Sequence, residues 1–532
     1  YDPGNDRWIR GSYFFNGSDN VEDQSLQREQ FLGEDLSQSL DQLTSSRTDT
    51  RNHRLNLNAQ YQFSEGHDLR FRGNFSAGST DRTRIQNQTT LFPDGSLVNS
   101  AVTDLDSESD NLGGNARLTW RKRLGDSGRS LVFEARGNVN DRDSSSDLET
   151  EIGTPSVGDV VTYDELVQLQ TQDNLTTSES QRIALTQPLD DARRKVLEVY
   201  AERRSVREEQ VQSVFDVSGG TQVFDPALSS NLDQGYDYLN GGFRLSRNTE
   251  STFLTIGAEY QRSSLDGRVL DRDQRIERDF DFFLPSAVFR WEIEEGWTLE
   301  GSYRASAREP DARELQPFVD NTDPLNIYVG NPGLDPEFRH SISLNQRYFD
   351  QFTFRNIGAF ARFTYTTDAI QLARSTDSRG VQTVTPLNTD DGWSLNGGID
   401  FSTPLRSIGA EIELGYDLAW SRQQQLLNLE DNLTNIVRNG LSLSLENRRK
   451  TRFDLEGGVA FNFNDVTYSL NERLNQSYVN TTLNGRAEWY PSDAWTIGSS
   501  IQQRIFDEEV FGPGQNVTLW QASLSRFFMD QK

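Results

Sequence analysis

The 532-residue sequence contains no cysteine, one methionine and three histidines. The absence of cysteine excludes disulfide bonds, thiolate metal sites and a thiol nucleophile. His53, His67 and His340 are scattered along the chain, which argues against a zinc site. The sequence also lacks Gly-x-Ser-x-Gly, His-Glu-x-x-His and Walker motifs. We therefore expect no catalytic residues, no enzyme activity and no resident cofactor.

Long apolar runs are missing as well. The mean hydropathy is −0.70, and no run of 18 apolar residues exists, so the sequence excludes a transmembrane helix. It does not exclude strands that cross a membrane, because these alternate and leave little trace in hydropathy. The first residues lack a signal-peptide pattern, so we expect a mature form or a fragment. The net charge of −28 argues against nucleic-acid binding.

Aromatic residues, by contrast, are plentiful. The chain carries 31 Phe, 16 Tyr and 9 Trp, together 11% of the sequence. Low hydrophobicity and high charge are typical of disorder, but a disordered chain is poor in aromatics. The sequence therefore predicts an ordered fold that uses aromatic faces.

The apolar residues recur with a period of two. In residues 408–420 the apolar face carries Ile408, Ile412, Leu414 and Trp420, and the other face carries Glu411, Glu413 and Asp417. Residues 129–142, 251–264, 352–366 and 451–464 repeat the pattern, with Arg136, Glu259, Arg362, Asp454 and Glu456 on their polar faces. Only a β-strand separates two faces in this way.

Strand length and spacing favour a membrane barrel over a soluble sandwich. We count about twenty strands between residues 7 and 528, many of a dozen residues or more, where five or six is usual in globular proteins. Short turns follow every second strand, and long polar segments lie between them: 18–51, 79–111, 143–179, 208–233, 265–278, 309–338 and 367–390. Aromatics gather near strand ends, at Trp8, Trp297, Trp420, Trp489 and Tyr490. This rhythm predicts an antiparallel up-and-down β-barrel of the outer-membrane type, with long loops outside and short turns on the periplasmic side.

One segment fits two structures. Residues 190–214 have high helix propensity, but Asp190–Arg193 can also form a turn before an alternating strand that begins with Val196, Glu198 and Tyr200. The hairpin rhythm favours the strand.

A family resemblance rests on residues 308–340. Asp323-Pro324-Leu325-Asn326-Ile327 and Gly330-Asn331-Pro332-Gly333-Leu334-Asp335-Pro336-Glu337 resemble the loop of TonB-dependent receptor barrels that leads into a new strand. Leu185–Leu189 similarly resembles a hairpin of the Bacteroidetes-like members. The prolines fix φ, the glycines permit positive φ, and Asn331 and Asp335 favour turns. On these residues we expect a stiff rim rather than a ligand site.

The resemblance implies a function as well as a fold. Such receptors have 22 strands, a plug domain and a TonB box, and they take up scarce solutes with energy from the TonB complex. We expect one barrel domain over residues 1–532, incomplete at both ends, with the plug and the last strands absent. Membrane lipid, TonB and a surface lipoprotein are the expected partners. A structural or secretion-linked scaffold that docks lipoproteins and a passive porin are the alternatives.

The polar strand faces predict a water-filled lumen. Arg136, Glu259, Arg362, Glu411, Glu413, Asp454 and Glu456 would face it. Charge recurs on many strands, so we expect a hydrated wall rather than a pair of glycosidase carboxylates. An acidic lumen would disfavour polyanions and suit neutral or cationic solutes.

Two acidic runs are weak candidates for calcium. Asp104, Asp106, Glu108 and Asp110 alternate, and Asp141, Asp143 and Asp147 cluster. Oxygen ligands suit Ca²⁺, but neither run has the pattern of an EF-hand. We expect solvated loops at both places.

Overall fold

The computed structural model describes residues 7–32, 35–156, 160–270, 274–315, 319–320, 323, 325–377, 381–427, 430–448, 451–492, 494–507 and 516–527. Within these residues, twenty long strands form one antiparallel sheet. They are β1 (Arg7–Leu32), β2 (Asp35–Ser64), β3 (His67–Leu91), β4 (Leu97–Arg123), β5 (Ser130–Pro155), β6 (Val161–Pro188), β7 (Lys195–Ser218), β9 (Ser230–Asn248), β10 (Thr252–Val269), β11 (Gln274–Glu294), β12 (Trp297–Arg308), β15 (Glu337–Asp350), β16 (Arg355–Thr367), β19 (Gly392–Leu405), β20 (Ala410–Leu427), β21 (Glu430–Asn447), β22 (Phe453–Tyr468), β23 (Gln476–Ser492), β24 (Trp495–Ile505) and β25 (Val517–Arg526). The predicted all-β, up-and-down topology is confirmed.

Shorter elements interrupt this meander. They are β8 (Thr221–Phe224), α1 (Ala312–Leu315), β13 (Val319–Asp320), β14 (Asn326–Val329), β17 (Ala369–Thr376), β18 (Gln382–Thr389) and a 3-10 turn at Glu472–Leu474. In the described part of the chain, no helix is long and apolar enough to cross a membrane.

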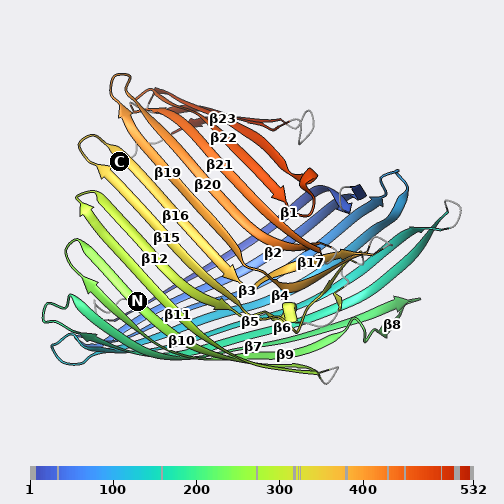
Figure 1. The fold of residues 1–532 in the computed structure, drawn as a ribbon, viewed down its shortest axis with the longest axis horizontal. Coiled ribbons are helices and arrows are strands. Elements are labelled where there is room, and N and C mark those ends of the chain that lie inside the picture. Colours follow the sequence, from blue (N-terminus) through green and yellow to red (C-terminus); the bar gives the residue numbers. More distant parts are fainter. Residues whose placement is uncertain are drawn as a thin grey trace.

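The sheet curves back on itself, so that β1–β6 lie behind β10–β19 (Figure 1). We call the whole curved sheet the wall. Each long strand pairs with the next one along the chain. Within the described residues no ladder joins β1 to β25. Because the twenty long strands alternate in direction, Arg7 and Arg526 lie on the same side of the sheet, the side of the short turns.

The short turns lie where the sequence predicts them. Gly66 and Gly296 adopt positive φ in two of these turns. Arg193, also at positive φ, donates its backbone N–H to Asp190. β7 begins after this turn, so residues 195–218 form a strand and the helical alternative is wrong.

The predicted long loops are mostly wrong. Residues 18–51, 79–111 and most of 143–179 continue β1–β6 as tall hairpins. β2 has 30 residues, or about 100 Å at about 3.4 Å per residue, whereas about ten residues cross a membrane. The sequence hides these extensions because both of their faces are largely polar, which removes the alternation. Of the predicted loops, 309–338 and 367–390 do leave the wall.

One face of the wall is apolar and exposed. Large side chains meet across strands on this face, as in Tyr13–Leu55, Phe71–Leu118 and Phe133–Ile183. Ile256 is 51% exposed and Phe283 65%. A continuous exposed apolar face of this size marks contact with lipid or protein.

Aromatic rings border the apolar face on both sides. Tyr61, Phe63, His67 and Trp120 are in contact near the short turns, and Tyr303, His340, Tyr365, Trp393 and Trp420 lie toward the opposite ends. On β2, Phe63 and His53 are ten residues apart, about 34 Å along the strand, or about 25 Å across the wall at the usual tilt. That height matches the apolar band of outer-membrane barrels. Trp8 and Tyr490 are exceptions to the prediction: they lie on the charged face, near Arg10 and Glu488 respectively.

Candidate functional site: an enclosed polar face crossed by an inner segment

The charged face of the wall is held together by cross-strand ion pairs. Glu134 on β5 is nearly buried and accepts hydrogen bonds from Arg117 while pairing with Arg136. Glu198 lies between Arg182 at 2.7 Å and Arg244 at 3.3 Å. Opposite charges on neighbouring strands stabilise a sheet, and shared carboxylates extend the pairing over three strands.

The predicted lumen residues lie on this charged face. Arg136 pairs with Glu134, and Glu259 accepts a hydrogen bond from Tyr200 at 2.5 Å. Glu411 pairs with Arg448 at 3.6 Å, and Glu413 accepts a hydrogen bond from Ser444 at 3.3 Å. Arg362 lies on β16 opposite Ser343 and Asn396, while Asp454 and Glu456 lie on β22 opposite Glu488 and Arg486. These residues are spread over the wall rather than gathered at one point.

In the tall hairpins, the two faces of the sheet differ in how many carboxylates they carry. Most carboxylates continue the exposed apolar face: Asp19, Asp49, Asp81, Asp104, Asp106, Glu108, Asp110, Asp141, Asp143 and Asp147, here called the outer carboxylates. Several are direct cross-strand partners, among them Asp19–Asp49 and Asp110–Asp143. Burial and the neighbouring carboxylates of Asp141, Asp173 and Asp110 raise the pKa of Asp143.

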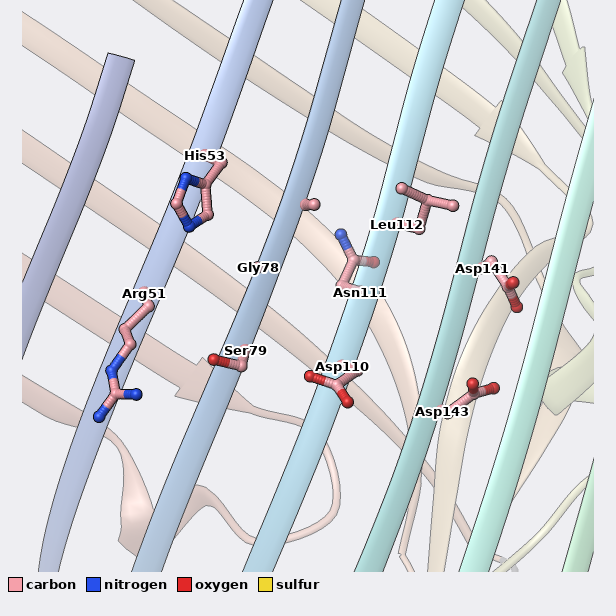
Figure 2. A pocket seen from close by; sticks show the side chains of 10 residues that line it. Arg51, His53, Gly78, Ser79, Asp110, Asn111, Leu112, Asp141 and Asp143 are labelled. Atoms are coloured by element: carbon pink, nitrogen blue, oxygen red, sulfur yellow. The ribbon is translucent and has the colours of Figure 1, made fainter. Parts of the chain in front are cut away.

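The calcium candidates belong to this set, and their predicted loops are wrong. Asp104–Asp110 lie within β4, and Asp141–Asp147 lie within β5. Alternate residues of a strand lie about 7 Å apart on one face, so they do not converge on an ion. In the described ranges, no group of three His, Cys, Asp or Glu side chains is arranged to hold a metal. Figure 2 shows Asp110, Asp141 and Asp143 around a hollow that Arg51 and His53 also line.

The histidines have structural partners. The Nδ1 atom of His53 lies 2.6 Å from the Tyr13 hydroxyl, and Nδ1 of His340 lies 2.9 Å from the Tyr303 hydroxyl. Nε2 of His67 accepts a hydrogen bond from the indole N–H of Trp120 at 2.9 Å. All three belong to the aromatic borders of the apolar face.

The other face of the tall hairpins is enclosed and lined mainly by amides and hydroxyls. Its buried members include Gln86, Gln88, Thr90, Thr103, Thr150, Gln168, Gln170, Gln210 and Gln234. Gln170 donates to Gln168 at 3.0 Å, Gln168 to Asp216 at 2.9 Å, and Thr150 to Thr103 at 3.2 Å. Buried polar groups of this kind need partners, and this face presents many donors and acceptors with little charge.

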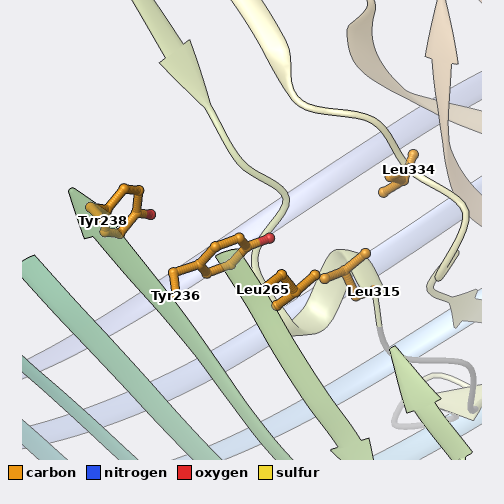
Figure 3. Close-up of a cluster of buried hydrophobic side chains, with 5 residues drawn as sticks. All are labelled: Tyr236, Tyr238, Leu265, Leu315 and Leu334. Carbon is orange, nitrogen blue, oxygen red and sulfur yellow. The ribbon is translucent and has the colours of Figure 1, made fainter. Parts of the chain in front are cut away.

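A segment of the chain crosses the space inside the wall. We call the described residues of 309–336, together with the hairpin β17–β18, the inner segment. Its first part contacts β9 and β10: Leu315 and Leu334 pack with Tyr236, Tyr238 and Leu265 (Figure 3), and Tyr236 donates to the carbonyl of Pro310 at 3.0 Å. Burial raises the pKa of Tyr236.

The inner segment also reaches the far end of the sheet. Leu325 and Asn326 line one small cavity with Arg28, Leu40 and Thr90, which belong to β1–β3. These strands lie many positions around the sheet from β12, where the segment begins. β14 pairs with β18 in parallel, and the Gln382 N–H donates to the Leu325 carbonyl at 2.8 Å. Both parts of the inner segment are thus joined where they meet β1–β3.

The family motif supplies most of these anchors. Asp323 accepts hydrogen bonds from the Leu325 N–H and the Asn326 side chain. Asn331 caps the Gly333 N–H at 2.8 Å and donates to the Pro386 carbonyl at 3.2 Å. The expected stiff rim is therefore a docked internal structure. Leu334 is 1% exposed.

The rest of the motif is buried or bonded as well. Gly330 and Pro336 are buried, and the carbonyl of Pro332 accepts from Arg278 at 3.4 Å. Glu337 is buried and accepts hydrogen bonds from Arg308 at 3.0 Å and the Ile370 N–H at 2.8 Å. Pro324 lies outside the described residues.

The comparisons with known proteins agree with this geometry. Residues 122–532 match the outer membrane protein beta-barrel family. The chain belongs to this family. No curated protein sequence matches it. Membership in this family places the barrel in the outer membrane.

Solved structures share the fold at low sequence identity. The copper transporter OprC matches with a TM-score of 0.51 and 13% identity over 98% of this chain and 81% of that chain. The ferripyoverdine receptor of Pseudomonas aeruginosa matches with a TM-score of 0.45 and 12% identity, over 94% and 68% of the two chains.

Proposed function

We propose that this barrel takes up a scarce solute across the outer membrane as the wall of a TonB-dependent receptor. The tall hairpins lie outside the cell, the short turns face the periplasm, and the charged face lines a lumen occupied by a plug. TonB would act on that plug, and the solute would pass along the enclosed face. The twenty-strand antiparallel meander of the receptor-type barrel carries this proposal, since barrels of this width need a filled lumen.

The inner segment adds support. It crosses the space that an open pore would leave free and contacts β9 and β10 in the middle of the sheet and β1–β3 at its first edge. A passive porin needs a continuous water path, so the segment favours a gated receptor over the porin alternative.

A test needs the full natural protein in its own membrane. Cells are treated with a short cross-linker, the barrel is purified through a tag on the gene product, and cross-linked proteins are identified by mass spectrometry. The same purified protein is placed in planar lipid bilayers. Recovery of TonB together with little steady conductance supports the proposal. Steady conductance without TonB would establish a porin instead.

The tall hairpins favour a second candidate, a scaffold that docks a surface lipoprotein. Strands of 24 to 30 residues extend far beyond the membrane band and present the outer carboxylates to the exterior. Such a surface suits a partner with basic side chains. Recovery of a surface lipoprotein without TonB, from a barrel that does not conduct, would favour the scaffold. Salt sensitivity of that complex would identify the outer carboxylates as the contact.

A further inference from the structure

A hollow lies on the side of the wall that carries the apolar face, at the foot of the tall hairpins. It is the hollow of Figure 2 and measures about 380 Å³, within the usual range for small-molecule sites. Ala77 and Ser79 of β3 lie between the longer side chains of β2 and β4. The hollow therefore follows from the side-chain lengths on three neighbouring strands.

This hollow lies across the border of the apolar face. His53 belongs to the aromatic border and faces Ala77, which in turn faces Leu112. Leu112 is 56% exposed and continues the apolar face. Two residues further along these strands, toward the tips of the hairpins, the same face is charged. Acyl chains that cover the apolar face would therefore place a lipid headgroup at this hollow.

The two sides of the hollow carry opposite charges. Arg51 lies on β2, whereas Asp110 and Asp143 lie on β4 and β5 (Figure 2). β2 and β4 are two strands apart, or about 10 Å. Arg51 also pairs with Asp49 at 3.6 Å, but its side chain is 62% exposed. Because exposed ion pairs contribute little, this pair leaves Arg51 able to bind another anion.

The acidic side of the hollow favours a cation. Asp110 and Asp143 are direct cross-strand partners, and like charges in this position destabilise a sheet. Burial and the neighbouring carboxylates raise the pKa of Asp143. In the described ranges these carboxylates do not converge as metal ligands do. A primary ammonium has three N–H donors, so it can bond to two separate carboxylates and relieve their repulsion.

We propose that this hollow binds the headgroup of a membrane lipid that carries both a phosphate and a primary ammonium. Arg51 would bond to the phosphate, because the guanidinium fork matches two anionic oxygens. Asp110 and Asp143 would accept hydrogen bonds from the ammonium, and the acyl chains would lie along Leu112 and the apolar face. The wall thus selects among lipids in the leaflet on the side of the tall hairpins. This role goes beyond the proposed function, since no step of solute uptake uses it.

Native mass spectrometry of the purified full-length protein in detergent measures this selection. Phosphatidylethanolamine, phosphatidylcholine and phosphatidylglycerol with the same acyl chains are added in turn. Phosphatidylcholine has an ammonium without N–H donors, and phosphatidylglycerol has no ammonium. We expect phosphatidylethanolamine to bind most tightly. Asp110→Asn combined with Asp143→Asn should weaken its binding about three- to tenfold, the size expected for two exposed ion pairs, and should abolish the preference. Arg51→Gln should weaken the binding of all three lipids, because each carries the phosphate.

Asp106→Asn combined with Asp147→Asn is the matched control. These two residues are also cross-strand partners on β4 and β5, but they do not line the hollow. The control should keep the preference. Equal binding of the three lipids, a preference for phosphatidylglycerol, or an equal loss in the control would overturn the site.

Misfolding would not explain a loss of binding, because replacing Asp143 relieves repulsion within the sheet. TonB cross-linking and conductance do not depend on these residues, so this proposal and the proposed function fail separately.

Discussion

Leu334→Ala should release the inner segment while leaving the wall intact. Leu334 is 1% exposed and packs against Tyr236, Tyr238 and Leu265. Truncating a fully buried leucine costs about 2–5 kcal/mol, which combines lost burial with the remaining cavity. The wall does not depend on this contact, because its strands hydrogen-bond to their own neighbours. The cost therefore falls on local opening of the segment, which rises by about 30-fold to several thousandfold.

Hydrogen exchange with mass spectrometry measures this opening. Peptides that cover β17–β18 and residues 325–335 should lose protection, while peptides from β20–β22 keep theirs. Leu372→Ala is the matched control: it removes the same atoms from β17, but Leu372 is 45% exposed, so exchange should change little. Unchanged exchange in Leu334→Ala, or equal loss of protection in the wall, would refute the docking of the segment.

Three further predictions concern the wall and the hairpins. Gly296→Ala should destabilise the barrel more than Gly409→Ala in urea unfolding, because both turns have positive φ but only a Cβ at Gly296 would meet the Phe349 carbonyl; equal losses would contradict the clash. Glu134→Gln should lower the free energy of unfolding by about 1–2 kcal/mol, since two half-exposed arginines lose their shared carboxylate, and an unchanged urea midpoint would show that the pairs contribute nothing. Asp143→Asn should increase hydrogen-exchange protection of β4–β6 at neutral pH. The raised pKa of Asp143 means that its ionised form destabilises the fold, so this gain should disappear as pH falls below the unfolded value of about 3.9, and a gain that persists there would contradict the electrostatic origin.

The wall could be predicted from the sequence because one of its faces meets an apolar surrounding. The alternation in residues 408–420 locates β20, and the turn at Asp190–Arg193 identifies β7 despite its helix propensity. In both places, one face of the strand meets an apolar surrounding and the other a polar one. This difference outweighs the secondary-structure propensity of the individual residues.

The tall hairpins could not be predicted in the same way. In β4, Asp104 and Asp106 face water on one side, while Thr103 faces the amide-lined interior on the other. Both faces are polar, so the hydrophobic alternation disappears and the residues resemble a loop. The cross-strand carboxylates add to this impression, because acidic runs are typical of solvated segments.

The position of the inner segment depends on contacts between residues far apart in the sequence. The motif predicted a stiff structure, and the docked loop agrees with it. Arg28 and Gln382, however, are 354 positions apart, and nothing local to either residue indicates the other.

Orientation in the outer membrane is the central claim, and surface labelling tests it most directly. The chain contains no cysteine, so Gln222→Cys at the end of a tall hairpin and Ser407→Cys in a short turn each introduce a single thiol. Both positions are exposed. In intact cells that express the full protein, a membrane-impermeant maleimide should label position 222 and leave position 407 unlabelled until the cells are opened. Labelling of position 407 alone in intact cells would reverse the orientation and contradict the account.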